Sequence, residues 1–191
     1  FFDQKKLGKG LGELHLKSAE SNPKMFGFPV EGFIGTTEQK KGWENNWLDC
    51  FLNLRIIPQL SILKSNILDQ ATINKIKEKI KLELLNYKPI NALVHGDLWS
   101  GNIGTQENGK GIIFDPASWW ADTEVDIAMT RLFGGFRKEF YEEYHKILPI
   151  RKGFEKRIII YNFYHILNHA NMFRGSYFNQ VKDYVKAILN M

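Results

Sequence analysis

The sequence predicts a mostly helical α+β fold with one small β ribbon. Several long segments repeat apolar residues at intervals of three and four, as helices do, whereas only two short apolar runs have the composition of strands. The chain has 191 residues, of which 43% are hydrophobic and 14% aromatic. This length suits one domain or one large lobe, and this composition can fill a substantial core. We therefore expect residues 1–191 to form a single folded unit.

The first predicted helix covers about residues 5–18. Leu7, Leu11 and Leu14 repeat at helical spacing. Glycines at positions 8, 10 and 12 also suggest a loop that binds phosphate, but no strand precedes them and no Gly-Lys-Ser/Thr sequence follows. The favoured interpretation is a helix that packs closely on a neighbour at its glycines.

The following segments alternate between loop and helix. Residues 26–42 read as a loop because glycine recurs through them. Residues 43–65 return to a helical pattern, in which Pro58 is expected to bend or restart the helix. Residues 71–87 place isoleucine and leucine on one face and Lys and Glu on the other, which predicts an amphipathic surface helix.

The best strand candidates are residues 92–95 and 111–114, and we expect them to form the small β ribbon. The dipeptide Asn108-Gly109 just before the second run favours a turn. After Asp122 the pattern is helical in pieces that glycine and proline separate. These pieces are residues 124–133, 137–147, 155–172 and 178–190.

The net charge of +5 and the pI near 9.2 suit an anionic partner. The charge is diluted along the chain, however, and no tract contains only Lys and Arg. Much of the excess comes from lysines between residues 75 and 88, which read first as the solvated face of a helix. A nucleic-acid surface is the minority interpretation, and we expect no nucleic-acid partner.

Cys50 is the only cysteine, so no disulfide can form within the chain. It lies in an aromatic run, where a small buried hydrophobe is expected rather than a nucleophile. No apolar stretch is long enough to cross a bilayer and no signal peptide is recognisable, so we expect a cytoplasmic protein with no membrane partner. The chain does not begin with Met and runs straight into a helical pattern, so we expect a segment of something longer.

The most informative motif places three polar residues at the ends of the two predicted strands. Asp97 follows the first strand, Asn102 lies five residues later, and Asp115 ends the second strand thirteen residues after that. Singly, each is an ordinary turn or helix-capping residue. Together they match what phosphoryl transfer needs, namely one carboxylate for the proton of an attacking hydroxyl, and an amide and a second carboxylate for a metal ion.

The residues around this motif resemble a known family. HGDLWSGN at 95–102 and FDPAS at 114–118 are similar to the fructosamine kinases (ketosamine kinases), a branch of the fold shared by protein kinases and aminoglycoside phosphotransferases. Further similar segments run from Leu14-His15 to residues 167–171, so the resemblance covers nearly all of the chain. In this fold the histidine of the motif, His95, supports the loop and is assigned no chemistry.

The resemblance implies roles for five residues. Asp97 would be the catalytic base for a sugar hydroxyl, and Asn102 and Asp115 would bind Mg²⁺ that bridges the phosphates of ATP. Trp99 would form an apolar wall on which the sugar stacks, with a core aromatic as the alternative. His169, on an apolar helix, would contact the substrate, although a structurally satisfied helical histidine is the favoured alternative.

The resemblance also implies a second lobe. Members of this fold grip ATP between a β-rich N-terminal lobe and a helical C-terminal lobe, and the similarity here begins just after the first of these. We find no strand-borne lysine suited to the phosphates, so we expect a C-terminal lobe whose N-terminal partner is absent. For this chain alone we expect negligible ATP-dependent transfer. Departures from the family pattern at residues 31–32 and 38–41 concern substrate-facing details of the segment 26–47.

The function that the resemblance implies is an ATP- and Mg²⁺-dependent kinase. It would phosphorylate a sugar hydroxyl of ketosamines, either small molecules or glycated proteins. Within the same fold, an aminoglycoside or choline-type hydroxyl kinase is the nearest alternative, and Trp99 and Phe-Asp-Pro at 114–116 argue against it. A truncated, non-catalytic remnant with a binding role is the alternative from another class. A nucleic-acid binder comes third, because no aromatic platform is interleaved with Arg.

Overall fold

A four-stranded antiparallel sheet lies at the centre of the structure, a computed structural model that describes residues 3–107 and 110–191. Its strands are β1 (Phe26–Phe28), β4 (Gly42–Glu44), β5 (Asn91–Val94) and β8 (Trp119–Asp122). Their order across the sheet is β4-β1-β8-β5, with β8 pairing along the whole of β5 and meeting β1 at Gly27 and Trp120.

Helix α1 (Gln4–Glu20) begins at a side-chain cap and packs on α6 (Lys138–Ile147). The Asp3 carboxylate accepts the backbone N–H groups of the first turn, which satisfies donors that have no partner inside the helix. A Cβ atom on Gly8 would lie 2.1 Å from the carbonyl oxygen of Phe140 in α6. The predicted close packing of a glycine-containing helix is therefore confirmed.

The segment 26–44 forms strands where the sequence predicts a loop. β1 pairs with β4, and a hairpin of β2 (Gly32–Ile34) and β3 (Thr37–Gln39) lies between them. At Gly27 the backbone has φ +120°, and a Cβ atom would lie 2.0 Å from the carbonyl oxygen of Gly42. Short strands that need glycine at such close approaches have the composition of loops, so the loop prediction was wrong.

The helical pattern at residues 43–65 gives two helices joined by a wider turn. α2 (Trp47–Phe51) is capped by Asn46, a π-helical segment follows at Leu52–Ile56, and α3 (Ile57–Ile62) has Pro58 in its first turn. Proline lacks the N–H that the preceding turn would need. The backbone stays right-handed helical at Phe51, Ile56 and Ile57, so the helix widens just before Pro58 and does not restart there. Residues 43–44, predicted as helical, belong to β4 instead.

Helix α4 (Gln70–Leu84) is amphipathic, as predicted. Asp69 caps it by accepting the backbone N–H of Thr72, and Ile76, Ile80 and Leu84 are buried. The lysines of this segment lie mostly on the exposed side. The helix ends three residues before the predicted boundary at residue 87.

The two predicted strands do not pair with each other, so the expectation of a single β ribbon was wrong. β5 belongs to the central sheet, whereas β7 (Gly111–Ile113) forms a separate hairpin with β6 (Ile103–Thr105). The prediction missed β6 and β8, the partners that take up the edges of β5 and β7. Each has only three or four residues, too few to show an alternating pattern. The predicted turn at Asn108-Gly109 lies outside the described residues.

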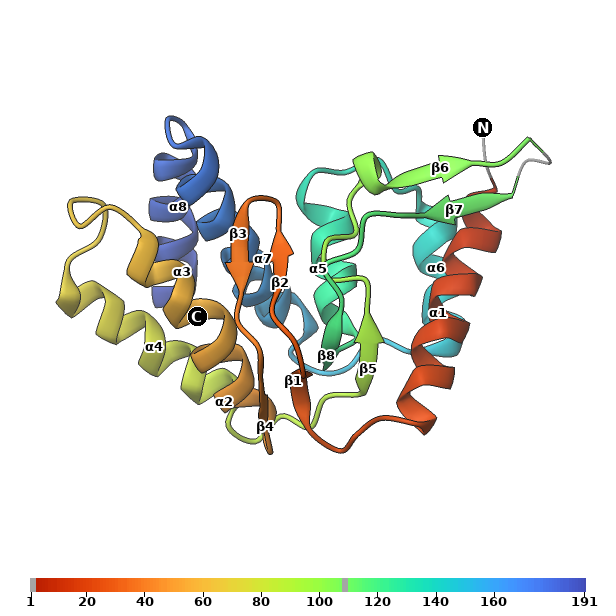
Figure 1. The fold of residues 1–191 in the computed structure, drawn as a ribbon, viewed down its shortest axis with the longest axis horizontal. Helices are drawn as coiled ribbons and strands as arrows, with labels where there is room; N and C mark the ends of the chain where they lie inside the picture. Colours follow the sequence, from red (N-terminus) through yellow and green to blue (C-terminus); the bar gives the residue numbers. More distant parts are fainter. Residues whose placement is uncertain (1–2, 108–109) are drawn as a thin grey trace.

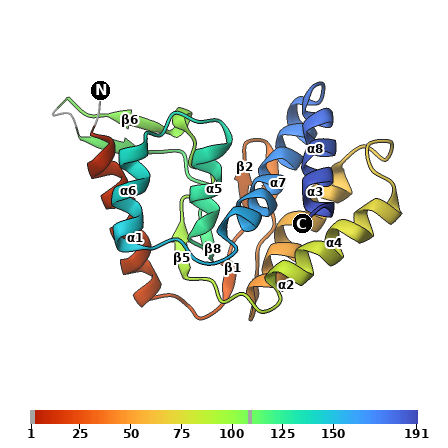
Figure 2. The ribbon, with the colours of Figure 1, turned by 180° about the vertical axis from the view of Figure 1, so that it is seen from behind.

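Four helices complete the chain, and their predicted ranges are correct to within a residue at each end. Their bounds are α5 (Glu124–Leu132), α6 as given above, α7 (Phe154–Phe173) and α8 (Tyr177–Leu189). Figure 1 shows α1 and α6 on one side of the central sheet and α2, α3, α4 and α8 on the other. In Figure 2, from behind, α7 runs between α5 and α8.

An aromatic cluster forms the centre of the core. Trp47 and Trp119 stack with ring centroids 5.5 Å apart, and Phe51 and Tyr161 contact Trp47 edge-on or tilted. Two of its polar groups are paired, since Trp47 Nε1–H donates to the Tyr161 hydroxyl, which donates to Asp122, whereas Nε1 of Trp119 is buried without a hydrogen-bond partner among the described residues. Cys50 is fully buried nearby, and burial raises the pKa of its thiol to about 12, which confirms the predicted small hydrophobe.

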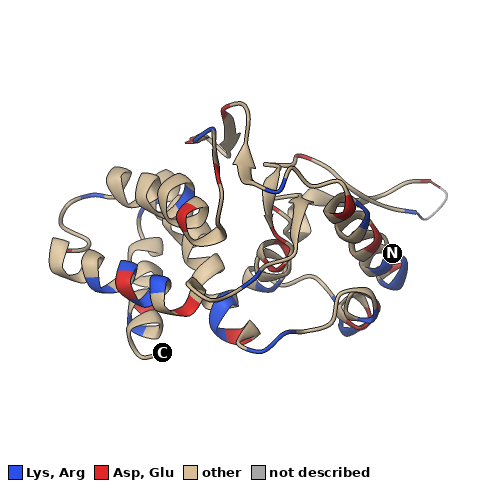
Figure 3. Cartoon of the chain, turned by 90° about the horizontal axis from the view of Figure 1, so that it is seen from below, with Lys and Arg blue, Asp and Glu red and all other residues tan. Residues whose placement is uncertain are grey.

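Charged side chains are dispersed over the surface. Figure 3 shows basic and acidic segments interleaved over the helices, without a single basic face. Within the described residues, no helix is long and apolar enough to cross a membrane.

Candidate functional site

A fully buried carboxylate holds the loop that follows β5. Asp126, in the first turn of α5, accepts the backbone N–H groups of His95 at 2.7 Å and Gly96 at 2.8 Å. It also accepts Nε2–H of His15, on α1, at 3.1 Å. Burial raises the pKa of Asp126, but its hydrogen bonds and the nearby histidines outweigh burial and leave the pKa below its usual value. An ionised Asp126 therefore fixes the backbone just before Asp97.

The imidazole of His95 joins the two halves of the motif. The backbone N–H of Asp97 donates to Nδ1 at 3.3 Å, so the hydrogen lies on Nε2, which donates to the carbonyl oxygen of Phe114 at 2.9 Å. Because Phe114 directly precedes Asp115, one side chain sets the position of one loop relative to the other. This geometry agrees with the predicted structural role of His95.

Gly96 allows the two loops to lie against each other. Its φ of +83° is in the left-handed region, and a Cβ atom there would lie 2.1 Å from the carbonyl oxygen of Ala117. The backbone N–H of Ala117 donates to the carbonyl of His95 at 2.9 Å. Only glycine combines this conformation with so close an approach.

The amide of Asn102 is oriented by the loop that carries Asp97. Its Nδ2 donates to the backbone carbonyl of Asp97 at 2.8 Å and to the Asp97 carboxylate at 3.3 Å. The backbone carbonyl oxygen of Asn102 in turn accepts the backbone N–H of Phe114 at 3.1 Å. With its nitrogen held in this way, the side chain presents Oδ1 as the remaining atom for a ligand.

The carboxyl group of Asp97 is half-buried and its pKa is shifted. Burial, the largest influence, raises the pKa to about 6, and the negative charges of Asp115 and Asp126 act in the same direction. The neighbouring His95 and the hydrogen bond from Asn102 oppose this shift without cancelling it. Such a group is ionised at neutral pH but holds a proton more readily than an ordinary aspartate.

Asp115 is exposed at the end of β7, in an unusual backbone conformation. Its φ is +56°, in the left-handed region that residues other than glycine rarely occupy, and Pro116 follows it. Aspartate tolerates this region better than most residues, and strained conformations of this kind cluster at functional sites. Asn102 donates to the Asp97 carboxylate and the charge of Asp115 acts on it, so the three polar residues of the motif lie together, from the loop after β5 and the two ends of the β6–β7 hairpin.

Trp99 and His169, far apart in the sequence, are connected through Phe133. The rings of Trp99 and Phe133 meet edge-on at 6.1 Å, and those of Phe133 and His169 lie 4.9 Å apart. Trp99 is 38% exposed and Phe133 is 38% exposed, so neither is a core aromatic. Phe173 and Tyr177 continue the row beyond His169.

His169 offers one free ring nitrogen to this surface. Its Nδ1 donates to the carbonyl oxygen of His165 one turn earlier at 2.8 Å, which leaves Nε2 as an acceptor. Burial lowers the pKa of His169, so its ring is neutral at physiological pH. This hydrogen bond within the helix is the arrangement that the sequence favoured for His169, and it uses only one of the two ring nitrogens.

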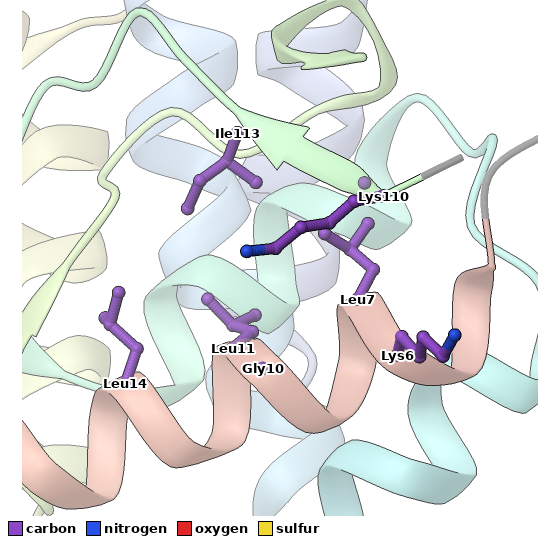
Figure 4. A pocket seen from close by; sticks show the side chains of 8 residues that line it. Lys6, Leu7, Gly10, Leu11, Leu14, Lys110 and Ile113 are labelled. Carbon is purple, nitrogen blue, oxygen red and sulfur yellow. The ribbon is translucent and has the colours of Figure 1, made fainter. Parts of the chain in front are cut away.

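A separate apolar pocket lies between α1 and β7. It has a volume of about 550 Å³, and Figure 4 shows Leu7, Leu11 and Leu14 pointing from α1 towards Ile113 and Lys110. None of the three motif residues lines it. The pocket therefore adds an apolar surface beside the hairpin and is not the place where the carboxylates meet.

Sequence reasoning missed the residues that position the motif. Asp126 and His15 hold the loop, and Phe133 connects the two predicted substrate residues. A signal for Asp126 exists, because a carboxylate in the apolar run Ile127-Ala128-Met129 is unusual and a buried charge needs partners. Phe133 lies in the segment 133–136, which resembles the family, but nothing in the sequence there indicates a contact with Trp99 or His169.

Comparison with known proteins shows the family of the chain. A model of the family described as "Fructosamine kinase" matches residues 2–191. The chain belongs to the fructosamine kinase family. The resemblance seen in the sequence is thereby confirmed.

Curated relatives in this fructosamine kinase family carry the names of kinases. A protein of Vibrio parahaemolyticus named as a probable ketoamine kinase is 40% identical over 97% of this chain and 63% of its own length. Ketosamine-3-kinase of Mus musculus is 32% identical over 95% of this chain and 67% of its own length. The chloroplastic protein-ribulosamine 3-kinase of Oryza sativa subsp. japonica is 36% identical over 99% of this chain and 55% of its own length.

Solved structures described as fructosamine-3-kinases have the same fold. The one from Haemophilus somnus superposes with a TM-score of 0.87 at 28% identity and covers 97% of this chain, which spans 63% of it. The one from Thermobifida fusca gives 0.85 at 26% identity and covers 98% of this chain, which spans 65% of it. The chain thus spans less than two thirds of the first relatives and structures that it matches.

Proposed function

We propose that this chain is the catalytic and substrate-binding lobe of an ATP-dependent kinase that phosphorylates a sugar hydroxyl of ketosamines. The acceptor would be a small ketosamine or a glycated protein. The observation that carries the proposal is the surroundings of Asp97, which follows a backbone segment fixed by the buried Asp126, whose carboxylate accepts the amide of Asn102 and whose pKa is raised by the nearby charge of Asp115. The names of the relatives support the same reaction class.

Asp97 is the proposed base. Its half-buried carboxylate accepts or orients the proton of the attacking hydroxyl, and a raised pKa suits a group that must hold that proton during transfer. Asp126 fixes the backbone of His95 and Gly96, directly before this residue.

Asn102 and Asp115 are the proposed metal ligands. The oxygens of an amide and a carboxylate are hard donors, which suits Mg²⁺. Within the described residues, no cluster of three or more His, Cys, Asp or Glu side chains could hold a metal by itself, and Mg²⁺ commonly uses only one or two carboxylates together with substrate phosphates. Bound there, Mg²⁺ would neutralise charge on the ATP phosphates.

Trp99, Phe133 and His169 form the proposed acceptor surface. A sugar ring presents C–H groups on its faces and hydroxyls at its rim, and an exposed aromatic wall with one neutral imidazole acceptor complements both. The row begins at Trp99, two residues beyond Asp97, so a sugar stacked there lies close to the proposed base.

The test is phosphorylation of a ketosamine by the full-length gene product and by its Asp97→Asn variant. We expect loss of turnover by about 10²- to 10⁴-fold, the usual contribution of a positioned base, with the Tm unchanged or higher because an ionised half-buried carboxylate is removed. Asp183→Asn, an exposed change on α8, is the matched control and should leave turnover unchanged. Equal turnover in wild type and Asp97→Asn would refute the proposal.

A further inference from the structure

Arg55 is a buried cation without an acidic partner. It lies in the π-helical segment after α2 and is 1% exposed. Its guanidinium stacks on Trp119 with 4.0 Å to the ring centroid, and Nη1 donates to the carbonyl oxygens of Lys40 and Leu54. Nε and Nη2 are buried and have no hydrogen-bond partner among the described residues. No carboxylate in residues 3–107 or 110–191 pairs with Arg55.

Such an arrangement is costly unless a ligand completes it. A buried charge that lacks a counter-ion loses the solvation that water gave it, and each buried N–H without an acceptor adds to that loss. Trp119 covers one face of the guanidinium, and the two carbonyl oxygens accept hydrogen bonds from Nη1 only. Nε–H and Nη2–H make up the other edge, which is the fork that binds a carboxylate through two parallel hydrogen bonds.

A pocket lies beside Arg55. It has a volume of about 230 Å³ and is lined by Arg55, Lys40, the β2–β3 hairpin and residues 116–118. Gln39 Nε2–H donates to the carbonyl oxygen of Ala117, which ties the hairpin to that segment. Lys40 adds a second positive charge, while Glu31 at the rim is paired with Lys41 at 3.3 Å. The pocket therefore favours an anion.

The pocket lies next to the proposed phosphotransfer site. Residues 116–118, on its wall, directly follow the proposed metal ligand Asp115. Tyr164 is buried close enough to both sites that the charges of Arg55 and Asp97 both act on its phenol. An acceptor whose sugar lies at Asp97 can thus extend towards Arg55.

We propose that Arg55 and Lys40 bind a carboxylate on the amine half of the acceptor. This inference rests on the proposed function and narrows its substrate class to ketosamines formed from amino acids with a free carboxylate. Neutral ketosamines, which lack this group, bind more weakly. A guanidinium edge with two donors matches the planar carboxylate, and the amine half of such a ketosamine carries that group a few bonds from the sugar.

The test compares one acceptor in two forms, the ketosamine of glucose and glycine and its glycinamide counterpart. Calorimetric titration of the full-length gene product without nucleotide measures the affinity of each form, and phosphorylation assays give the KM of each. We expect the carboxylate form to bind at least about tenfold more tightly than the glycinamide form, because hydrogen bonds between charged groups contribute that much to affinity. In Arg55→Met the ratio of the two affinities should fall towards one.

Lys40→Gln keeps the test decisive if Arg55→Met does not fold, because Lys40 is exposed. It should lower the preference for the carboxylate severalfold, whereas Lys182→Gln, an equal charge change on α8, should not. Equal affinity for the two forms, or an unchanged preference in Lys40→Gln, overturns the inference. Phosphorylation of both forms with equal KM overturns the inference about the carboxylate and leaves the proposed function standing. Failure to bind or phosphorylate either form overturns the proposed function as well.

Discussion

Single buried residues decide how the loop around Asp97 is shaped. Asp126 accepts two backbone N–H groups and one imidazole N–H, so its negative charge is matched on every side by donors. Asparagine in place of Asp126 has the same shape, but its NH₂ group would face an N–H group that now donates to a carboxylate oxygen. The loop depends on the charge of Asp126 rather than on its size.

Asp126→Asn should lower the free energy of unfolding by about 3 kcal/mol, because buried donors lose a charged acceptor. It should also reduce phosphoryl transfer, since the backbone before Asp97 is no longer held. Urea denaturation and the turnover of the full-length gene product measure the two effects. A variant as stable and as active as Asp183→Asn would contradict this account.

His165 makes the stability of the core depend on pH. Burial, followed by the nearby His169, lowers its pKa to about 3, and neither ring nitrogen has a partner in the described part of the chain. Below a pH of about 6.5 the unfolded state takes up a proton that the folded state refuses, so stability falls as the pH drops from 6.5 towards 3.

His165→Leu should remove this part of the acid sensitivity. The difference in unfolding free energy between variant and wild type should grow in favour of the variant by up to about 1.4 kcal/mol per pH unit below 6.5. Denaturant titrations at pH 7.5, 6 and 5 measure it. An identical pH dependence for the two proteins would show that His165 takes up its proton in the folded state.

At the scale of elements, the contact between α1 and α6 depends on one glycine and not on its neighbour. A Cβ atom at Gly8 would meet the backbone of Phe140, whereas one at Gly10 would have nothing within 4 Å. Both residues lie in the same helix and neither has a positive φ, so they form a matched pair.

Gly8→Ala should destabilise the protein by about 1–3 kcal/mol, because the two helices must separate to admit a methyl group. Gly10→Ala should stabilise it by about 0.5–1 kcal/mol through helix propensity alone. The midpoints of urea denaturation distinguish the two. Effects of the same sign would mean that α1 and α6 do not pack as described.

Elements with strong periodicity were predictable, whereas several of the short strands that are held by pairing were not. The apolar stripe at Ile76, Ile80 and Leu84 identifies α4 because a helix buries one face wherever its partner lies. β8 and the strands between 26 and 44 depend on partners that are remote in sequence, and their short glycine- and tryptophan-containing runs carry no periodic signal. The same distinction holds for the site.

The residues of the candidate site that lie within one short motif could be predicted from their spacing, and His169 only from the family resemblance. The other residues that only the fold brings near could not be predicted. Asp97, Asn102 and Asp115 lie within nineteen positions, 97 to 115, so their spacing is visible in the sequence. Arg55, His15 and Phe133 reach the site from three separate helical segments or their ends. Their positions depend on packing, which a single sequence does not express.

At the scale of the whole molecule, the described chain supplies one side of the proposed reaction. The proposed base, metal ligands and acceptor surface all come from it, whereas the relatives have more than a third of their length beyond what the chain spans in the first of these matches. We propose that binding of ATP needs groups outside the 191 residues of this chain.

The 191-residue chain alone should therefore transfer negligible phosphate from ATP to a ketosamine. It should nonetheless bind a ketosamine, because the acceptor surface is complete within the described residues. A phosphorylation assay and a calorimetric titration on the same sample measure both. Measurable phosphorylation by this chain would show that its own residues suffice to hold the nucleotide.

The bonds to Asp126 also set an order of events during synthesis. His15 lies 111 positions before Asp126, and the loop N–H groups lie 31 and 30 positions before it. As the chain leaves the ribosome, residues 95–102 emerge before the carboxylate that fastens them exists. The bonds that fix the backbone at His95 and Gly96 can form only after α5 has been made, so we expect the centre of the motif to reach its final shape late in folding.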